Sequence, residues 1–145
     1  MLKVSGQIIV HRTPGDLWRL LMDPVVLRKC LPKCEEFEEI SPRKFRVSLK
    51  MGVGLIRSRF RGEAELKDVV EGEGYRFELF AKGTGGSVEG ATVVRLASAA
   101  EGSKTELYYV SDARVSGLIA SMGAKLFEGT ARSLAEQFFD EISKL

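Results

Sequence analysis

The sequence predicts an α+β fold in which a curved antiparallel β-sheet of about seven strands wraps around a long C-terminal helix. Two observations carry this prediction. Residues 34–115 alternate between apolar and polar side chains, which is typical of strands with one face on a core and one in water. Residues 117–145 instead carry apolar side chains at helical spacing. A single sheet around the final helix buries every one of these apolar faces.

The first 30 residues predict one strand followed by two short helices. Leu2–Val10 alternates in a mostly regular way, as a strand with one apolar face does. Thr13-Pro14 is a helix start signal, because Thr is a good N-cap and Pro fits the first helical position. Asp23-Pro24 repeats the signal, so we expect a second helix that ends near Cys30.

The segment after Cys34 predicts about six strands joined by short turns. The clearest is Ile56–Leu66, in which Ile, Ser, Phe, Gly, Ala and Leu alternate with charged residues. Turn signals rich in glycine and charged residues separate the strands at residues 52–54, 71–74, 83–86 and 100–104. Short turns of this kind favour antiparallel hairpins.

The final helix is expected over residues 117–145, with a length of roughly 40 Å at about 1.5 Å per residue. Its apolar face combines Ile119, Met122, Leu126, Leu134, Phe138, Ile142 and Leu145, widened by Phe127, Ala131, Ala135 and Phe139. Its first half also contains Gly117, Gly123 and Gly129, and each interior Gly costs about 1 kcal/mol relative to Ala. Two interpretations stay open: close approach to the sheet, or a shallow face beside a space for a ligand.

The composition fits one globular domain that spans residues 1–145. Hydrophobic residues make up 44% and charged residues 29% of the chain. The apolar runs are far shorter than the ~20 residues that cross a bilayer, and the N-terminus lacks the features of a signal peptide. The net charge of +2 does not favour nucleic acid as a partner. We expect a cytoplasmic protein.

Amide side chains are depleted, which is typical of proteins from thermophiles. The chain has no Asn, and Gln occurs only at positions 7 and 137.

The two cysteines, Cys30 and Cys34, and the single histidine, His11, do not predict a metal site. A Cys/His zinc site needs four ligands, which this set cannot supply. The cysteine spacing also differs from that of a CxxC redox motif. A disulfide and a pair of partly buried thiols both remain open, and the thiols are favoured.

The order of elements resembles the helix-grip fold of the START/Bet v 1-like (SRPBCC) superfamily. Three segments resemble, more narrowly, the CoxG subunit of carbon monoxide dehydrogenase. They are DPVVLRKCLPKCEEFEEI after the first helix, the VGLIRSRFRGEAEL strand, and VSGLIASMGAKLFEGTARSLAEQFFDEI at the end. There are two departures. Lys33 stands where the family usually has Gly, and the chain ends at Leu145, where many members continue into a membrane-binding tail.

The superfamily resemblance implies a hydrophobic cavity between the sheet and the long helix. The family resemblance implies an accessory protein of molybdenum-containing dehydrogenases, which acts in maturation or links the enzyme to the membrane and its quinone pool. We therefore expect a non-catalytic carrier or adaptor that binds a quinone or lipid, with no other cofactor and at most peripheral contact with the inner face of the membrane. One alternative is a cyclase or aromatase that uses Asp112, Arg114 and Tyr109 in the same cavity. The other is a solid-core module that docks a dehydrogenase.

The candidate ligand-binding residues are inward side chains of the strands and residues near the expected mouth of the cavity. They are Trp18, Leu27, Phe45, Leu49, Ser58, Phe60, Phe77, Leu79, Tyr109, Ser111, Leu118, Met122 and Leu126. Aromatic rings supply apolar walls, hydroxyl groups supply a few polar contacts, and small residues such as Gly62 leave volume. Trp18 and Leu27 are expected to meet Leu118 and Met122 at the mouth. A filled core is the alternative interpretation.

A basic surface is predicted on the outward faces of two neighbouring strands. Its residues are Lys44, Arg46, Lys50, Arg57, Arg59 and Arg61. A solvated face balanced by nearby glutamates is one interpretation. The other is a docking patch for an acidic partner or an anionic membrane.

Overall fold

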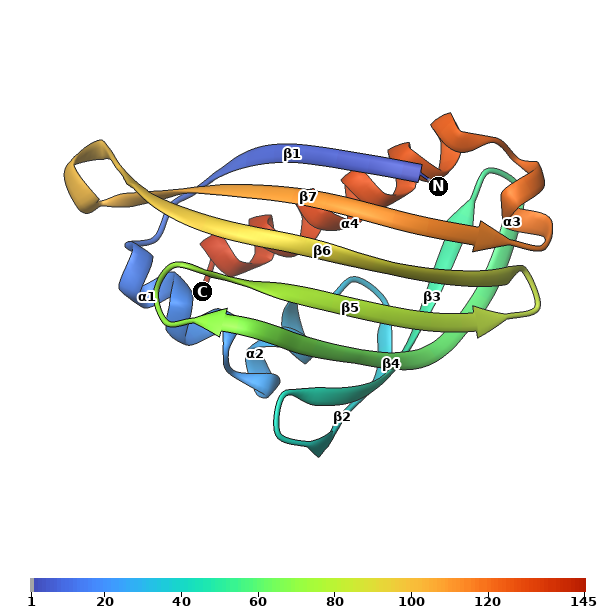
Figure 1. Cartoon of the computed structure of the whole chain (residues 1–145), viewed down its shortest axis with the longest axis horizontal. Coiled ribbons are helices and arrows are strands. Elements are labelled where there is room, and N and C mark those ends of the chain that lie inside the picture. The colour runs from blue at the N-terminus through green and yellow to red at the C-terminus, as the bar shows by residue number, and fades with distance from the viewer. Residues whose placement is uncertain (1) are drawn as a thin grey trace.

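The computed structural model describes residues 2–145 and has the predicted α+β architecture (Figure 1). In chain order the elements are β1 (Leu2–Val10), α1 (Pro14–Leu21), α2 (Pro24–Cys30), β2 (Cys34–Ser41), β3 (Lys44–Val53), β4 (Ile56–Val70), β5 (Gly74–Gly83), β6 (Gly86–Ala99), the 3-10 turn η1 (Ala100–Gly102), β7 (Lys104–Ser116), α3 (Leu118–Ser121) and α4 (Ala124–Ser143).

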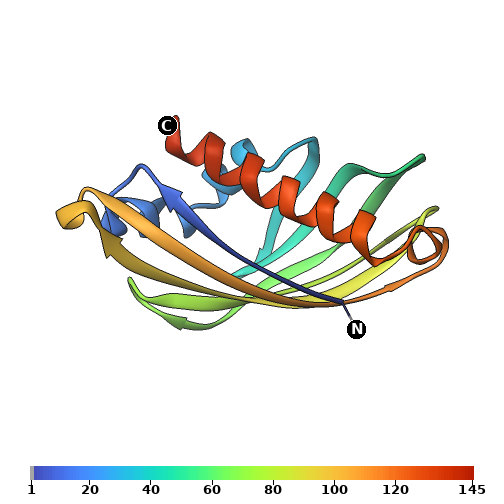
Figure 2. The same ribbon diagram turned by 90° about the horizontal axis from the view of Figure 1, so that it is seen from above.

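The seven strands form one antiparallel sheet in the order β1-β7-β6-β5-β4-β3-β2. Strands β2 to β7 pair with their neighbours in the sequence, as the short turns predicted. β1 closes the other edge by pairing with β7, from Leu2 opposite Ala113 to Val10 opposite Thr105. The sheet curves, and α4 crosses its concave face (Figure 2).

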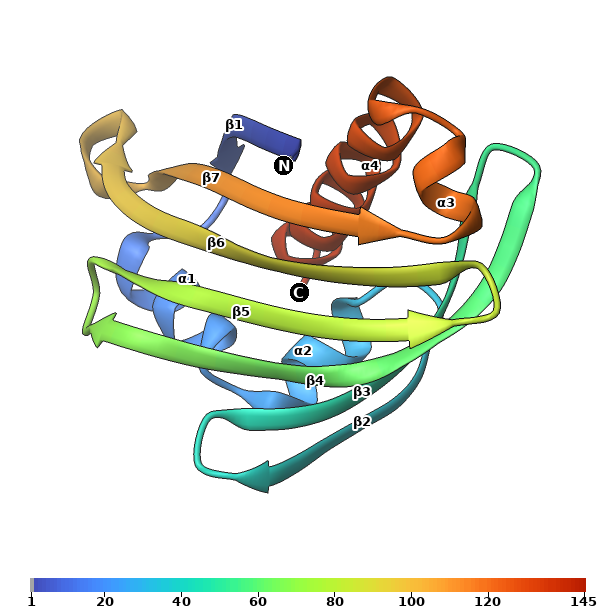
Figure 3. The ribbon, with the colours of Figure 1, turned by 45° about the vertical axis from the view of Figure 1, so that its right-hand side comes forward.

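The two short helices begin where the sequence predicted. The Thr13 side chain accepts a hydrogen bond from the Asp16 amide at 3.2 Å and caps α1. The Asp23 carboxylate accepts one from the Val25 amide at 2.9 Å and caps α2. Both bonds satisfy amide groups that have no partner inside the helix. The two helices carry the chain from one edge of the sheet to the other, at one end of the concave face (Figure 3).

The final helix differs from the prediction because it is broken into two. The four-residue α3 ends at Ser121, and α4 begins at Ala124. Gly117 and Gly123 stand before the two helices with φ angles of 83° and 94°, a backbone conformation that favours glycine. The Ile119 amide donates to the Gly85 carbonyl at 2.9 Å, which fixes α3 on the β5–β6 turn. Ile119 lies before the break and still packs into the core. Apolar residues of the predicted helix are therefore buried on both sides of the break.

The core divides into three clusters rather than one layer. The first joins α1 and the end of α4 to β1, β6 and β7, around Leu17, Leu107 and Ile142. The second lies beneath α3 and the start of α4, around Phe60 and Phe127. The third lies beneath α2 on β3 to β5, and its four buried residues are Phe45, Val47, Ala64 and Leu66. The inner face of the sheet is therefore covered in separate regions.

Gly62 allows β4 and β5 to approach each other closely. Gly62 pairs with Ala81, and a Cβ atom at Gly62 would overlap the carbonyl oxygen of Phe80. We expected Gly62 to leave volume in a cavity, but the space beside it is occupied by the backbone of β5. Glycine is needed here for the path of the strand.

Replacing Gly62 with alanine is expected to lower the free energy of unfolding by about 1–3 kcal/mol, because the added methyl group displaces the backbone of β5. Gly15→Ala in α1 is the matched control. Nothing lies within 4 Å of a Cβ atom there, so its stability should stay equal or rise by up to about 1 kcal/mol. Urea denaturation measures both. Equal stabilities for the two variants would contradict a close approach at Gly62.

Candidate ligand-binding site

A hollow of about 390 Å³ lies between α4 and β3. It is lined by Pro32, Lys33, Lys50, Met51, Gly52, Lys125, Leu126, Gly129, Thr130, Ser133, Leu134 and Gln137. On its other side α4 packs against the edge of the sheet, where the Arg132 guanidinium donates to the Ser5 carbonyl of β1 at 2.8 Å. The helix is thus fixed along β1 and leaves space along β3.

The side chains of α4 explain this asymmetry. Phe127, Phe139 and Ile142 are buried against the sheet. The flank towards β3 carries the small residues Gly129 and Ser133, which fill little volume. Leu126, a candidate ligand-binding residue, lines the hollow, and so does Leu134, which was expected on the same apolar face. The amphipathic pattern therefore predicted the apolar residues of the helix but not which of them pack on the sheet.

On the inner face of the sheet, several side chains are only half-buried. Leu49, Phe77 and Leu79 pack against the third cluster without being fully enclosed. Leu79 also packs against the second cluster, so it lies between the two. These three are candidate ligand-binding residues, and the structure brings them to one cluster from β3 and β5, which lie on either side of β4. Phe45 and Phe60 are buried at 3% exposure, one in each of the same two clusters.

The expected mouth of the cavity is not assembled as predicted. Trp18 and Leu27 belong to α1 and α2, whereas Leu118 begins α3 and Met122 follows it, and these helices occupy opposite ends of the sheet (Figure 1). Trp18 is buried against Tyr75, with ring centroids 6.1 Å apart. The sequence indicated that these side chains face inward. It carried no signal for which end of the sheet each helix covers.

Two of the expected polar contacts are already engaged within the protein. The Ser58 hydroxyl accepts from the Gly85 amide at 3.0 Å and holds the β5–β6 turn. The Ser111 and Thr92 hydroxyls are 2.7 Å apart across β6 and β7. The Tyr109 ring lies over Gly6 of β1, where a Cβ atom would overlap its phenol.

Tyr75 is a polar group inside the fold that was not among the candidate residues. It extends from the start of β5 and packs against the first and third clusters. Burial raises the pKa of its phenol above the usual range, so the hydroxyl stays protonated and acts as a donor. The signal was present in the sequence, because Tyr75 alternates with Phe77 and Leu79 on the inward face.

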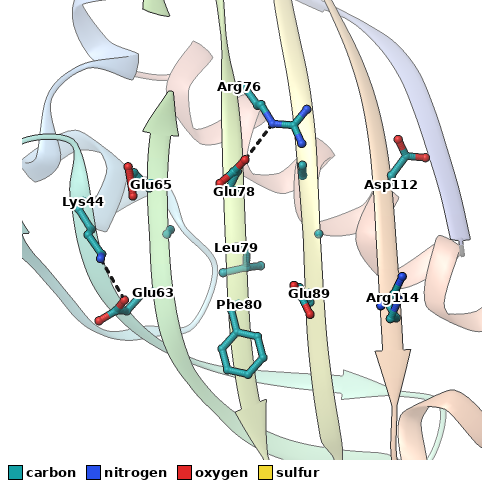
Figure 4. A pocket seen from close by; sticks show the side chains of 13 residues that line it. Lys44, Glu63, Glu65, Arg76, Glu78, Leu79, Phe80, Glu89, Asp112 and Arg114 are labelled. Carbon is teal, nitrogen blue, oxygen red and sulfur yellow. Dashed lines mark hydrogen bonds and ion pairs between the residues drawn. The ribbon is translucent and has the colours of Figure 1, made fainter. Parts of the chain in front are cut away.

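A second hollow, of about 550 Å³, lies on the outer face of the sheet (Figure 4). Charged side chains dominate it, and several are paired with each other. The Arg76 guanidinium donates to Glu78 at 3.0 Å, and Lys44 lies 3.6 Å from Glu63. Hydrogen bonds from Lys67 and Arg76 lower the pKa of Glu78 below its usual range. This surface is suited to water and ion pairs rather than to an apolar ligand.

The predicted basic surface is largely balanced by glutamates. Lys44 pairs with Glu63, and Arg46 lies 3.5 Å from Glu38. Arg59 donates to both carboxylate oxygens of Glu35, at 2.6 and 3.1 Å, and these bonds lower the pKa of Glu35. Lys50 approaches the same carboxylate at 4.0 Å. Within residues 2–145, only Arg57 and Arg61 of the six form no ion pair.

Neither a metal cluster nor a membrane-spanning helix is found in the part of the chain that the structure describes. No group of three or more His, Cys, Asp or Glu side chains in residues 2–145 is placed to hold a metal ion. No helix in the same residues is long and apolar enough to cross a bilayer.

The sequence pattern of the CoxG subunit family of carbon monoxide dehydrogenase matches residues 6–145. The chain belongs to the CoxG family. A comparison with curated proteins gives no match.

Solved structures show the same fold as this CoxG protein. A conserved protein from Geobacillus kaustophilus has 29% sequence identity and a TM-score of 0.93, over 99% of this chain and 93% of that one. The ZhuI aromatase/cyclase from Streptomyces sp. R1128 has 12% identity and a TM-score of 0.69, over 98% and 91%. A START superfamily protein from Mycobacterium smegmatis has 11% identity and a TM-score of 0.67, over 98% and 94%. The fold is therefore START-like.

The two cysteines are free thiols in this CoxG structure. Burial raises the pKa of Cys30, and the nearby Glu141 carboxylate adds to the effect. Burial also raises the pKa of Cys34, whose thiol donates to the Glu36 carbonyl at 3.3 Å. Both groups are therefore protonated, and weak nucleophiles, at neutral pH.

Alkylation with iodoacetamide at pH 7.5 is expected to be slow, with Cys34 modified before the buried Cys30. Unfolding in guanidinium should make both react rapidly, since burial is the cause of the slow reaction. Mass spectrometry of tryptic peptides over time measures the two rates. Fast modification of Cys30 in the folded protein, or a mass short of two hydrogen atoms, would contradict the pair of buried thiols.

Proposed function

We propose that this CoxG protein binds a hydrophobic small molecule, an isoprenoid quinone or a lipid, between α4 and the sheet, and carries it without catalysing a reaction. The observation that supports this most directly is the hollow between α4 and β3. Inward side chains of the sheet also remain half-buried, among them Leu49, Phe77 and Leu79. A filled core would leave little such surface uncovered.

An apolar ligand gains binding free energy by covering this surface. Each Å² of apolar surface removed from water contributes about 25 cal/mol, less the cost of immobilising the ligand. The rim of the hollow adds the polar ends of Thr130, Ser133 and Gln137. A ligand with an apolar body and a polar head group matches such a site, with its body inward and its head at the rim.

Transport rather than catalysis is favoured by the state of the hydroxyl groups. Ser58 and Ser111, two of the groups expected to contact a ligand, are engaged in hydrogen bonds that hold the sheet together. Asp112 and Arg114, considered for a cyclase, lie at the outer hollow on the face away from α4. A cyclase would need an acid or base directed into the inner space.

The family supports a partner as well as a ligand. We propose that the protein serves a molybdenum-containing dehydrogenase in the cytoplasm. The description of the CoxG family as a subunit of carbon monoxide dehydrogenase supports a dehydrogenase partner. Arg57 and Arg61 are the residues of the predicted basic surface that remain available to an acidic partner.

Thr130→Phe is expected to weaken quinone binding at least about ten-fold, because the ring occupies the hollow beside β3. Thr130 is well placed for this test, since its hydroxyl lies 3.5 Å from the Gly52 carbonyl across the hollow. Trp18 is the only tryptophan, so quenching of its fluorescence by decylubiquinone measures the affinity. Oleic acid, as a competitor, tests for a lipid.

Glu136→Phe is the matched control, since Glu136 is exposed on α4 and does not line the hollow. It adds the same ring and should leave affinity unchanged. Circular dichroism checks that both variants fold. Extraction of purified native protein with organic solvent, followed by mass spectrometry, identifies any ligand carried from the cell. No extracted ligand, and no binding of either probe to the wild type, would overturn the proposal.

A further inference from the structure

Three exposed leucines lie at the end of the molecule that holds α3. Leu55 at the β3–β4 turn is 96% exposed, Leu118 in α3 is 60% exposed, and Leu126 at the start of α4 is 47% exposed. They come from two segments more than 60 residues apart in the sequence. Large apolar side chains this exposed are ordinary when scattered singly, but a group at one end marks a contact surface.

Contacts within the protein place these segments together. A Cβ atom at Gly54 would touch Leu126 at 3.5 Å and overlap the end of Met122, so the β3–β4 turn rests on the start of α4. The bond from the Ile119 amide to Gly85 fixes α3 on the β5–β6 turn. The same end of the sheet therefore carries both turns and α3 (Figures 1 and 3).

The charge of this end is mostly positive, although Glu63, Glu89 and Glu128 directly follow the segments that form it and Glu89 lies opposite Arg114. The three segments that form it are residues 50–62, 82–88 and 114–127, which we call the basic end. They contain Lys50, Arg57, Arg59, Arg61, Lys82, Arg114 and Lys125, and no Asp or Glu. Glu35 of β2 reaches Arg59 and Lys50 from outside these segments. The whole chain has a net charge of only +2, so positive charge is concentrated here.

We propose that the basic end binds the surface of an anionic phospholipid bilayer, with the three leucines inserted among the head groups. Apolar side chains that penetrate the interface, surrounded by Lys and Arg at the level of the phosphates, are the combination that such a surface recognises. A purely electrostatic contact would not account for Leu55, whose side chain is 96% exposed. Unlike Lys44, Arg46 and Arg59, Arg57 and Lys125 form no ion pair in the described chain.

The hollow beside α4 opens next to this contact. Met51, Gly52, Lys125 and Leu126 belong both to the lining of the hollow and to the basic end. Binding to the bilayer at this end would therefore bring the opening to the lipid surface. The membrane contact itself does not depend on whether the hollow holds a ligand.

Sedimentation with vesicles tests the proposal. Wild-type protein should bind phosphatidylcholine vesicles that contain phosphatidylglycerol far more tightly than vesicles of phosphatidylcholine alone, and less tightly at high salt. Leu55→Ser with Leu118→Ser should weaken binding about ten-fold or more, since the inserted apolar surface is lost. Arg57→Gln with Lys125→Gln should weaken it about 25-fold, or roughly five-fold for each charge.

Matched controls come from the opposite end and the outer face. Val25→Ser with Val110→Ser removes apolar groups that are 76% and 53% exposed, and Arg28→Gln with Lys29→Gln removes two exposed charges of α2. Both controls should bind vesicles like the wild type. All four substituted pairs are exposed, and thermal unfolding confirms that each variant folds.

Three results would overturn the proposal: no binding by the wild type, equal losses in the controls, or losses in the charge variant alone, which would show electrostatic adsorption without insertion. Thr130→Phe separates this proposal from ligand binding. It should lose quinone affinity and keep vesicle binding. The two proposals can therefore be tested, and can fail, independently of each other.

Discussion

The packing of α4 on one side of a curved sheet is the constraint on which the rest of the structure depends. Phe127, Phe139 and Ile142 need apolar cover, and a flat sheet would touch a helix along only one line. The sheet curves around the helix (Figure 2), and at Gly62 the strands β4 and β5 approach closely. Along β1 the helix is held by Arg132, whereas along β3 it touches the strand at Thr130 and Gly52 and leaves a hollow beside that contact. The small residues Gly129 and Ser133 on this flank of α4 leave the volume of the hollow unfilled.

Much of the fold could be predicted because it depends on local signals. The alternation of strands such as Ile56–Leu66 and the side-chain caps at Thr13 and Asp23 act over a few residues, and each appears in the structure as expected. The break between α3 and α4 could not be predicted in the same way. Apolar spacing persists through Met122 and Gly123, and only the contact of α3 with the β5–β6 turn shows why the helix stops. That contact joins residues far apart in the sequence.

The candidate site was predicted less completely, for a physical reason. Alternation tells which face of a strand a side chain occupies, and Leu49, Phe77 and Leu79 were placed on the inner face correctly. It does not tell how far along the sheet the helices reach. Trp18 and Met122 therefore turned out to lie at opposite ends. The lining from Thr130 to Gln137 was missed because its polar residues are typical of the solvent face of an amphipathic helix.

The order of the strands has a consequence for how the protein avoids self-association. β1 and β2 are the two edges of the sheet, and an exposed edge is a template for pairing with another chain. Along β1, the Ser5 carbonyl is occupied by Arg132. Along β2, register shifts near both ends interrupt the regular ladder, and glutamates at positions 35, 36, 38 and 39 would oppose the same strand of a second copy. Charge repulsion at one edge and a covering helix at the other protect an otherwise extendable sheet from aggregation.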